Sequence, residues 1–249
     1  MARTIVSLER HRHAIQSRED AMTEMRMGRE ARRSFAAGRE AIAEKREDLF
    51  ERKLFFDEVR NTLFSGSLSQ RQVDGMNALL DAWERLSVIK PDLDLRWLAY
   101  ILATDYHETA YTMQPIEEYG KGAGYDYGEP DPTTGECYYG RGLVQLTWAS
   151  NYQNAGEKVH ADLYWQPELA LEMPISVRVI MRGMYEGWFT GKKLEDYISG
   201  NECDYVGARK IVNGTDRAET IAGYAERFQS ALLVATSTVV SDHPDTEEE

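Results

Sequence analysis

The feature that most limits the fold of this chain is a series of amphipathic helical patterns, each bounded by residues that start or stop helices. Residues 54–64 (LFFDEVRNTLF) carry the first pattern, and Gly66 ends it. Ser69 is a candidate N-cap for the next helix, because Gln72 three residues later completes a capping-box pattern. Asp94 can cap a third helix, LRWLAYILATDYHE. These patterns favour a mainly α-helical domain.

The second half of the chain contains further helical patterns at residues 175–189 and 218–235. Between the two groups of helices, residues 119–139 are rich in Gly, Tyr, Pro and Asp. A loop of this length in a compact domain is usually functional or mobile. We therefore predict one domain over residues 54–235 and, after it, an acidic disordered tail over residues 236–249.

Residues 1–53 differ from the rest, because they are dense in Arg and Glu and contain no Pro. Large apolar side chains recur every seven residues from this segment onward: Phe35, Ile42, Leu49, Phe56 and Leu63. Charged residues and Gly occupy the positions where a coiled coil would need its second apolar stripe. The pattern predicts a long charged helical arm. The arm either lies on its own domain or docks another protein, which would be a virion protein or a second copy of this chain.

Charge and composition exclude several classes of protein. The formal net charge of the 249 residues is -13; residues 1–60 carry +2, so the remainder carries -15, which disfavours nucleic-acid binding through phosphate neutralisation. We expect no membrane insertion, because no apolar run approaches the roughly 20 residues of a membrane helix. The first residues lack the apolar core of a signal peptide, so we expect synthesis in a bacterial cytoplasm. Cys137 and Cys203 form neither a disulfide framework nor a zinc motif.

Glu108 is the first candidate catalytic residue. The tripeptide HET at 107–109 is not a zinc-protease site, because position 111 is Tyr and not the required His. Glu108 falls at the C-terminal end of an apolar helix, where the negative end of the macrodipole and partial burial both favour a neutral carboxyl. A neutral carboxyl is what a general acid needs to protonate a glycosidic oxygen.

A second carboxylate follows closely. Glu117 and Glu118 lie nine and ten residues after Glu108. Glycoside hydrolysis uses two carboxyl groups on opposite sides of a cleft, so either residue could complete the pair, unless both lie in a solvated loop.

Polar groups are concentrated in YYGRGLVQLTWASNY, residues 138–152. Gly140 and Gly142 indicate a tight turn, and the next polar residues supply amide and hydroxyl groups that suit a sugar: Gln145, Thr147, Asn151 and Tyr152. The alternative interpretation is a strand-like core segment over residues 143–148.

Four motifs together resemble glycoside hydrolase family 19: HET at 107–109, YYGRGLVQLT at 138–147, Asn151-Tyr152 and IVNG at 211–214. The resemblance extends to the plant-type chitinases and, more closely, to the phage endolysins of the family. It covers roughly residues 54–233 and leaves the arm outside. It implies a lysozyme-like, two-lobed helical fold with a substrate cleft, and inverting hydrolysis of β-1,4 bonds next to N-acetylated sugars.

The resemblance also implies roles for individual residues. Glu108 takes the place of the general acid, and Glu117 that of the second carboxylate, with Glu118 as the alternative. Thr147 takes the place of the residue that holds the attacking water. Four further residues match positions that bind sugar: Tyr139, Gln145, Asn151 and Asn213. The chain departs from the family in having Gly214-Thr215 where Gly-Gly is common.

The sequence thus predicts a peptidoglycan hydrolase of the endolysin or muramidase type, which needs no metal or organic cofactor and acts at the cell wall or from a virion. Three alternatives remain open. A chitinase would differ in the substituents that its cleft accepts, and a lytic transglycosylase would leave an anhydro sugar. A non-catalytic structural or wall-binding protein would bind glycan without cutting it.

Overall fold

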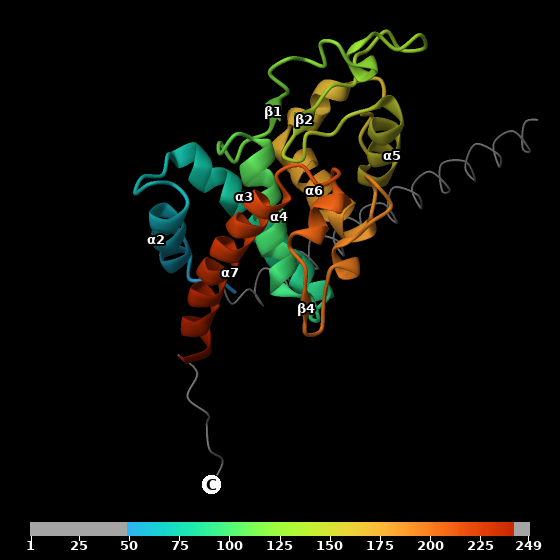
Figure 1. The fold of residues 1–249 in the computed structure, drawn as a ribbon. Coiled ribbons are helices and arrows are strands. Elements are labelled where there is room, and N and C mark those ends of the chain that lie inside the picture. Colours follow the sequence, from blue (N-terminus) through green and yellow to red (C-terminus); the bar gives the residue numbers. More distant parts are fainter. Residues whose placement is uncertain (1–48, 242–249) are drawn as a thin grey trace, which may run out of the picture. The chain divides into compact units, whose positions relative to one another are not determined.

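Helix α4 (Leu95–Glu108) is the central element of the structure, a computed structural model that describes residues 49–241 (Figure 1). Nine consecutive residues, from Leu98 to Tyr106, are buried. A helix that is buried on all sides must be covered by other elements. Its C-terminal end, which carries Glu108, lies toward β1 in the view of Figure 1.

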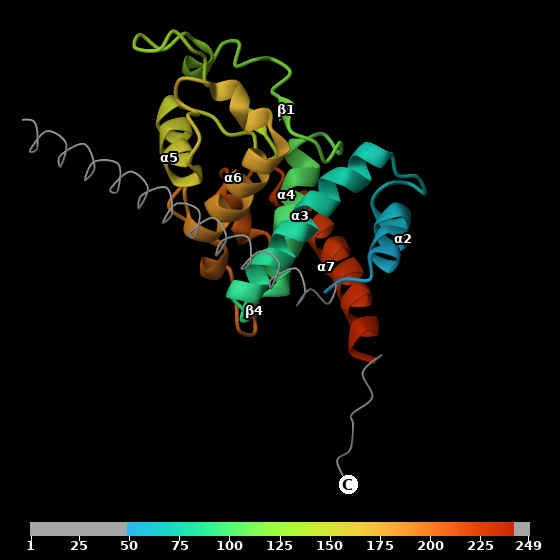
Figure 2. The ribbon, with the colours of Figure 1, turned by 180° about the vertical axis from the view of Figure 1, so that it is seen from behind.

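Four helices pack around or next to α4 (Figures 1 and 2). Helix α7 (Ala218–Ser241) lies along α4, and α2 (Arg52–Thr62) packs on α7. Helix α3 (Gln70–Ile89) contacts both α4 and α6 (Met173–Glu186). The remaining elements are short: β1 (Ile116–Glu117), η1 (Asp126–Gly128), β2 (Arg141–Gly142), α5 (Ala149–Val159), η2 (Pro167–Leu171), η3 (Leu194–Asp196), β3 (Ile198–Ser199), β4 (Glu202–Cys203) and η4 (Gly207–Ile211).

The predicted helix starts are confirmed by their caps. The Ser69 hydroxyl accepts from the Gln72 backbone N–H at 3.3 Å, and the Ser69 N–H donates to Gln72 Oε1 at 2.9 Å, so the capping box is complete. Asp94 Oδ1 accepts from the Arg96 backbone N–H at 3.0 Å and caps α4. Local sequence therefore sets where α3 and α4 begin.

Two short antiparallel strand pairs complete the fold. In the first, Ile116 pairs with Gly142 and Glu117 with Arg141. The long loop between these strands, residues 118–140, rises away from the helices in both ribbon views. It therefore begins and ends at the same place, beside the C-terminal end of α4.

The mainly helical fold predicted from the sequence is confirmed. Residues 143–148 do not form the alternative core strand: only Leu146 makes an isolated bridge, to Arg141. Packing of the domain begins before residue 54, because Phe50 is buried and the Glu51 N–H donates to the Ala235 carbonyl at 2.9 Å.

Helix α7 continues to Ser241, past the predicted domain end at residue 235. Residues 1–48, which make up nearly all of the predicted arm, and 242–249 of the predicted tail lie outside the described residues. The docking roles of the arm stay predictions. Within residues 49–241, none of the helices has the length and apolar character needed to cross a membrane.

Candidate active site

A cleft of about 710 Å³ opens at the C-terminal end of α4. Residues between Gly140 and Asn151 and residues 212–214 contribute to its lining. Five residues predicted from the sequence line it: Glu108, Gln145, Thr147, Asn151 and Asn213. The alternative second carboxylate, Glu118, lines it as well, whereas Glu117 and Tyr139 are not among its lining residues.

Glu108 is the last residue of α4, and its side chain is 16% exposed. Its Oε1 atom accepts a hydrogen bond from Arg209 Nη1 at 2.6 Å. Arg209 lies on η4, is itself buried, and donates from Nε to the Asp216 carbonyl at 3.1 Å. Because the Arg209 guanidinium contacts both Glu108 and the Asp216 carbonyl, it fixes the orientation of the Glu108 carboxyl in the cleft.

Glu118 follows directly after β1, and its two carboxylate oxygens have separate donors. Oε1 accepts from the Tyr127 hydroxyl at 3.3 Å, and Oε2 accepts from the Gly140 backbone N–H at 3.0 Å. A Cβ atom on residue 140 would lie 2.8 Å from Gln145 Oε1 and 3.3 Å from Glu118 Cβ. A side chain at position 140 would therefore crowd Glu118 and displace the Gln145 amide. Burial and the nearby Glu118 carboxylate raise the pKa of Tyr127 to about 12, so the hydroxyl stays a donor.

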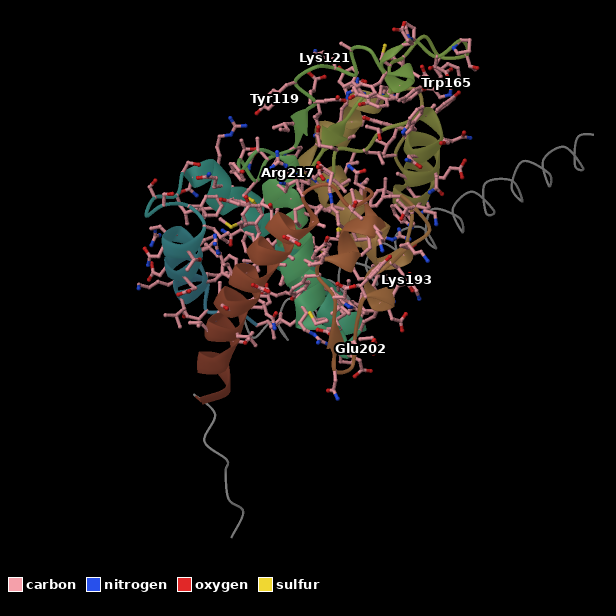
Figure 3. All side chains as sticks on the ribbon, in the orientation of Figure 1. Tyr119, Lys121, Trp165, Lys193, Glu202 and Arg217 are labelled. Atoms are coloured by element: carbon pink, nitrogen blue, oxygen red, sulfur yellow. The ribbon has the colours of Figure 1, made fainter. Side chains whose placement is uncertain are left out.

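Glu117 belongs to a different cluster, although it is the neighbour of Glu118. Its Oε1 accepts from the Tyr139 hydroxyl at 2.6 Å, its Oε2 lies 3.1 Å from Lys121 Nζ, and Oε1 lies 3.7 Å from Arg141 Nε. The Tyr139 hydrogen bond and the two cations lower the pKa of Glu117. Tyr119 and Lys121 both extend from the loop after β1 (Figure 3). We call Glu117, Lys121, Tyr139 and Arg141 the ion-pair cluster.

The ion-pair cluster explains why Tyr139 is not a lining residue of the cleft. The Arg141 guanidinium carbon lies 3.7 Å from the centroid of the Tyr139 ring, and Arg141 Nη1 donates to the Cys137 carbonyl at 2.9 Å. The Tyr152 hydroxyl donates to the Tyr139 carbonyl at 2.7 Å. The YYGRG string and Tyr152 thus hold β2 in place, a structural role that the sequence did not separate from sugar binding.

The segment before α5 presents the polar side chains to the cleft through unusual backbone angles. Gln145 has φ 53° and Trp148 has φ 72°, values that L-residues rarely adopt and that cost of order 1–3 kcal/mol each. Gln145 Nε2 donates to the carbonyls of Ile116 at 3.0 Å and Gly142 at 3.1 Å, so this side chain also joins β1 to β2. Thr147 lies between these two residues and is half-buried.

Residues 213 and 214 are an exposed part of the lining. Asn213 is exposed, and its Oδ1 accepts from the Gly214 N–H at 2.8 Å. His107, beside Glu108, also lines the cleft, and burial lowers its pKa. A neutral imidazole there adds no positive charge next to the acid.

Sequence reasoning missed three residues of the site: Arg209, Tyr127 and Trp148. Arg209-Lys210 looks like an ordinary solvated charge pair, and Tyr127 is one of several tyrosines in the 119–139 loop. The only available signal was position, since Arg209 lies four residues before Asn213 and Trp148 directly follows Thr147. Within residues 49–241, His, Cys, Asp and Glu side chains do not gather in groups of three or more that could hold a metal ion.

Comparisons with known proteins agree with this arrangement. Residues 106–193 match the family model for class I chitinases of glycoside hydrolase family 19. The chain is 35% identical over 182 residues to Chitinase 12 of Oryza sativa subsp. japonica, covering 58% of this chain and 56% of that protein. It is 31% identical over 116 residues to Chitinase 11 of the same organism, covering 36% of this chain and 44% of that protein. The chain thus spans about half the length of these curated relatives.

The fold is also similar to that of a solved structure. Chitinase C from Streptomyces griseus HUT6037 matches with a TM-score of 0.55 and 20% sequence identity, covering 76% of this chain and 94% of the other. At this identity the similarity concerns the fold, and it confirms the predicted lysozyme-like helical arrangement. Residues 106–193, which match the family model, contain HET, YYGRGLVQLT and the Asn-Tyr pair. Residues 106–193 of this chain thus match glycoside hydrolase family 19, and the fold is similar to that of a solved chitinase.

Proposed function

We propose that this chain is a glycoside hydrolase that cleaves β-1,4 bonds in polymers of N-acetylglucosamine. The observation that carries the proposal is that two carboxyl groups, Glu108 and Glu118, line the same cleft. Two carboxyl groups facing one substrate site are the equipment of acid/base glycoside hydrolysis. Amide and hydroxyl side chains beside them suit a substrate that carries hydroxyl and N-acetyl groups.

In this mechanism Glu108 protonates the oxygen of the leaving sugar. Arg209 holds Glu108 Oε1, which leaves Oε2 as the oxygen that donates the proton in this mechanism. Glu118 removes a proton from a water molecule that attacks the anomeric carbon from the opposite face. Thr147 orients that water. Attack from the opposite face inverts the anomeric configuration.

We assign the base role to Glu118 and not to Glu117. Glu118 lines the cleft, and its two donors are a tyrosine hydroxyl and a backbone N–H, both neutral. Glu117 is held by Tyr139 and two cations in the ion-pair cluster. A general base must reach the attacking water, and Glu117 is not among the residues that line the cleft.

Chitin-type polymers are the first candidate substrate, because the matched relatives are named chitinases. The formal net charge of -13 also favours an uncharged polymer over an anionic cell wall. Peptidoglycan is the second candidate, since it offers β-1,4 bonds between N-acetylated sugars and the sequence motifs resemble those of endolysins.

The test compares wild type with Glu108→Gln on chitin hexamer and on purified peptidoglycan. Products are reduced with borohydride and identified by mass spectrometry. We expect the rate of hexamer cleavage by Glu108→Gln to be about 10²–10⁴-fold lower than that of wild type, with an unchanged circular dichroism spectrum. Proton NMR during cleavage should detect the inverted anomer first.

Other outcomes would change the proposal in defined ways. Reduced muramic ends from peptidoglycan alone would make the chain a muramidase. Anhydro ends would indicate a lytic transglycosylase, and binding of glycan without any cleavage would indicate a structural protein. Equal activity of wild type and Glu108→Gln would refute the catalytic assignment.

A further inference from the structure

An unassigned group of aromatic side chains lies beside Glu118. We call Tyr125, Tyr127 and Trp148 the aromatic shelf. The Tyr125 and Tyr127 rings are stacked, with centroids 5.1 Å apart and an angle of 5° between planes. The Trp148 ring meets Tyr127 edge to face, with centroids 5.3 Å apart. All three residues line the cleft, and Tyr125 and Trp148 are 60% and 48% exposed.

Exposed aromatic rings of this kind call for an explanation, because a ring in contact with water does not gain the free energy of burial. Tyr125 lies in the loop outside the helical core, and its ring is stacked on that of Tyr127 at the cleft. A flat aromatic face suits the apolar C–H face of a sugar ring, whose hydroxyls then point to the rim.

Backbone contacts hold the aromatic shelf in place. The Tyr138 N–H donates to the Tyr127 carbonyl at 2.9 Å, and the Trp148 N–H donates to the Tyr138 carbonyl at 3.0 Å. Tyr138 is buried. Gly122 and Gly128 touch so closely that a Cβ atom on Gly128 would lie 2.1 Å from the Gly122 carbonyl oxygen. The loop that carries Tyr125 and Tyr127 is thus closed at its base, and the shelf is preorganised.

Tyr127 connects the shelf to the proposed base. Its ring lies between Tyr125 and Trp148 in the shelf, and its hydroxyl donates to Glu118 Oε1 at 3.3 Å. The Gly140 N–H holds the other oxygen of the same carboxylate. A sugar ring resting on the shelf would therefore lie next to the side chain that orients Glu118.

We propose that the aromatic shelf is a sugar-binding subsite on the Glu118 side of the cleft, and that Tyr127 is a positioning residue that orients the Glu118 carboxylate. This inference rests on the proposed function for its substrate class, a polymer of N-acetylated amino sugars. It assigns two separable tasks: Tyr125 and Trp148 bind the polymer, and the Tyr127 hydroxyl acts through Glu118.

The binding task is tested on the full chain carrying Glu108→Gln, which keeps the polymer intact. Chitin hexamer is titrated calorimetrically into this protein with and without Tyr125→Ala or Trp148→Gly. Glycine is chosen at position 148 because φ 72° suits it, so the ring is removed without adding backbone strain. We expect about tenfold weaker binding for each variant. Trp165→Ala is the control, since Trp165 is 54% exposed but is not among the residues that line the cleft.

The positioning task is tested by kinetics of Tyr127→Phe, which keeps the ring and removes one oxygen. We expect kcat to fall about tenfold, with KM within about twofold of wild type. Tyr119→Phe is the control, because Tyr119 is 84% exposed and is adjacent to Glu118 in the chain, yet it is not one of the lining residues (Figure 3). It should match wild type.

Each part can fail separately. Hexamer binding that is the same in Glu108→Gln with and without Tyr125→Ala would overturn the subsite. An unchanged kcat in Tyr127→Phe, or an equal fall in Tyr119→Phe, would overturn the positioning role. If wild type cleaved no polymer, both the proposed function and the positioning role of Tyr127 would be refuted. The titration would still test whether the aromatic shelf binds the polymer.

Discussion

Glu117 and Glu118 are consecutive residues of the same chain segment, and the structure gives them opposite surroundings. Glu117 ends in the ion-pair cluster, within 3.1 Å of Lys121 and hydrogen-bonded to Tyr139. Glu118 ends in the cleft, held by a hydroxyl and a backbone N–H. Successive side chains of a strand point to opposite faces, so β1 and the residue after it divide the pair between the two faces. One carboxylate contacts Arg141 of the partner strand, and the other faces the cleft.

The comparison teaches that spacing along the chain does not show which of two neighbouring carboxylates lines the cleft. The nine-residue interval from Glu108 selects Glu117, yet the structure brings Glu118 into the cleft with Glu108. What separates the two residues is the charge around them. Lys121 and Arg141 lie beside Glu117, whereas the donors to Glu118 are a tyrosine hydroxyl and a backbone N–H, both neutral.

The largest expected effect on kcat comes from replacing each of the two glutamates, Glu117 and Glu118, in separate variants. Glu118→Gln should lower kcat on chitin hexamer by about 10²–10⁴-fold, because it removes the proposed base. Glu117→Gln should change kcat by less than about threefold, since this side chain is not among those that line the cleft. Initial rates from released oligomers measure both. The reverse order would return the base role to Glu117.

A smaller effect on kcat is expected from replacing the cations that contact Glu108 and Glu117. Arg209→Lys should lower kcat by about tenfold, because lysine lacks the fork that contacts Glu108 and the Asp216 carbonyl together. Lys121→Met removes a cation from Glu117 instead and should leave kcat unchanged. Equal losses in the two variants would contradict separate roles for the cleft and the ion-pair cluster.

The smallest effect concerns stability and pH. The pKa of Glu117 is lowered in the folded chain, so its contribution is present above its unfolded pKa of about 4.3 and is lost as the pH falls through the folded pKa. Relative to wild type, Glu117→Gln should lower the free energy of unfolding by less than about 1 kcal/mol at pH 7, because the side chain is 35% exposed. The difference should shrink toward pH 3.

Urea unfolding at pH 7 and at pH 3.5 measures this difference. Tyr139→Phe removes the hydrogen-bond donor of the same pair, so its effect at pH 7 should not add fully to that of Glu117→Gln. Full additivity, or a difference that grows at low pH, would argue against the ion-pair cluster as the source of the lowered pKa.

Much of the fold was predictable because its signals are local. The Ser69 capping box, the Asp94 cap and the apolar face of α4 depend on residues three to seven positions apart, and they form as expected. The sequence motifs also brought Glu108, Thr147 and Asn151 to one cleft. Tyr139 and Tyr152 could not be separated from the sugar-binding residues, because buried and cleft-facing tyrosines look the same in a motif.

By itself, the sequence determined the helices, their caps and which short segments carry polar chemistry. Only the tertiary structure decided which glutamate faces the cleft, since β1 alternates its side chains and packing against β2 determines which side is open. Packing likewise brought Arg209 to Glu108, 101 residues away along the chain, and Tyr127 to Glu118. The physical reason is that a carboxylate's role depends on the charges and donors around it, and these come from segments distant in the sequence.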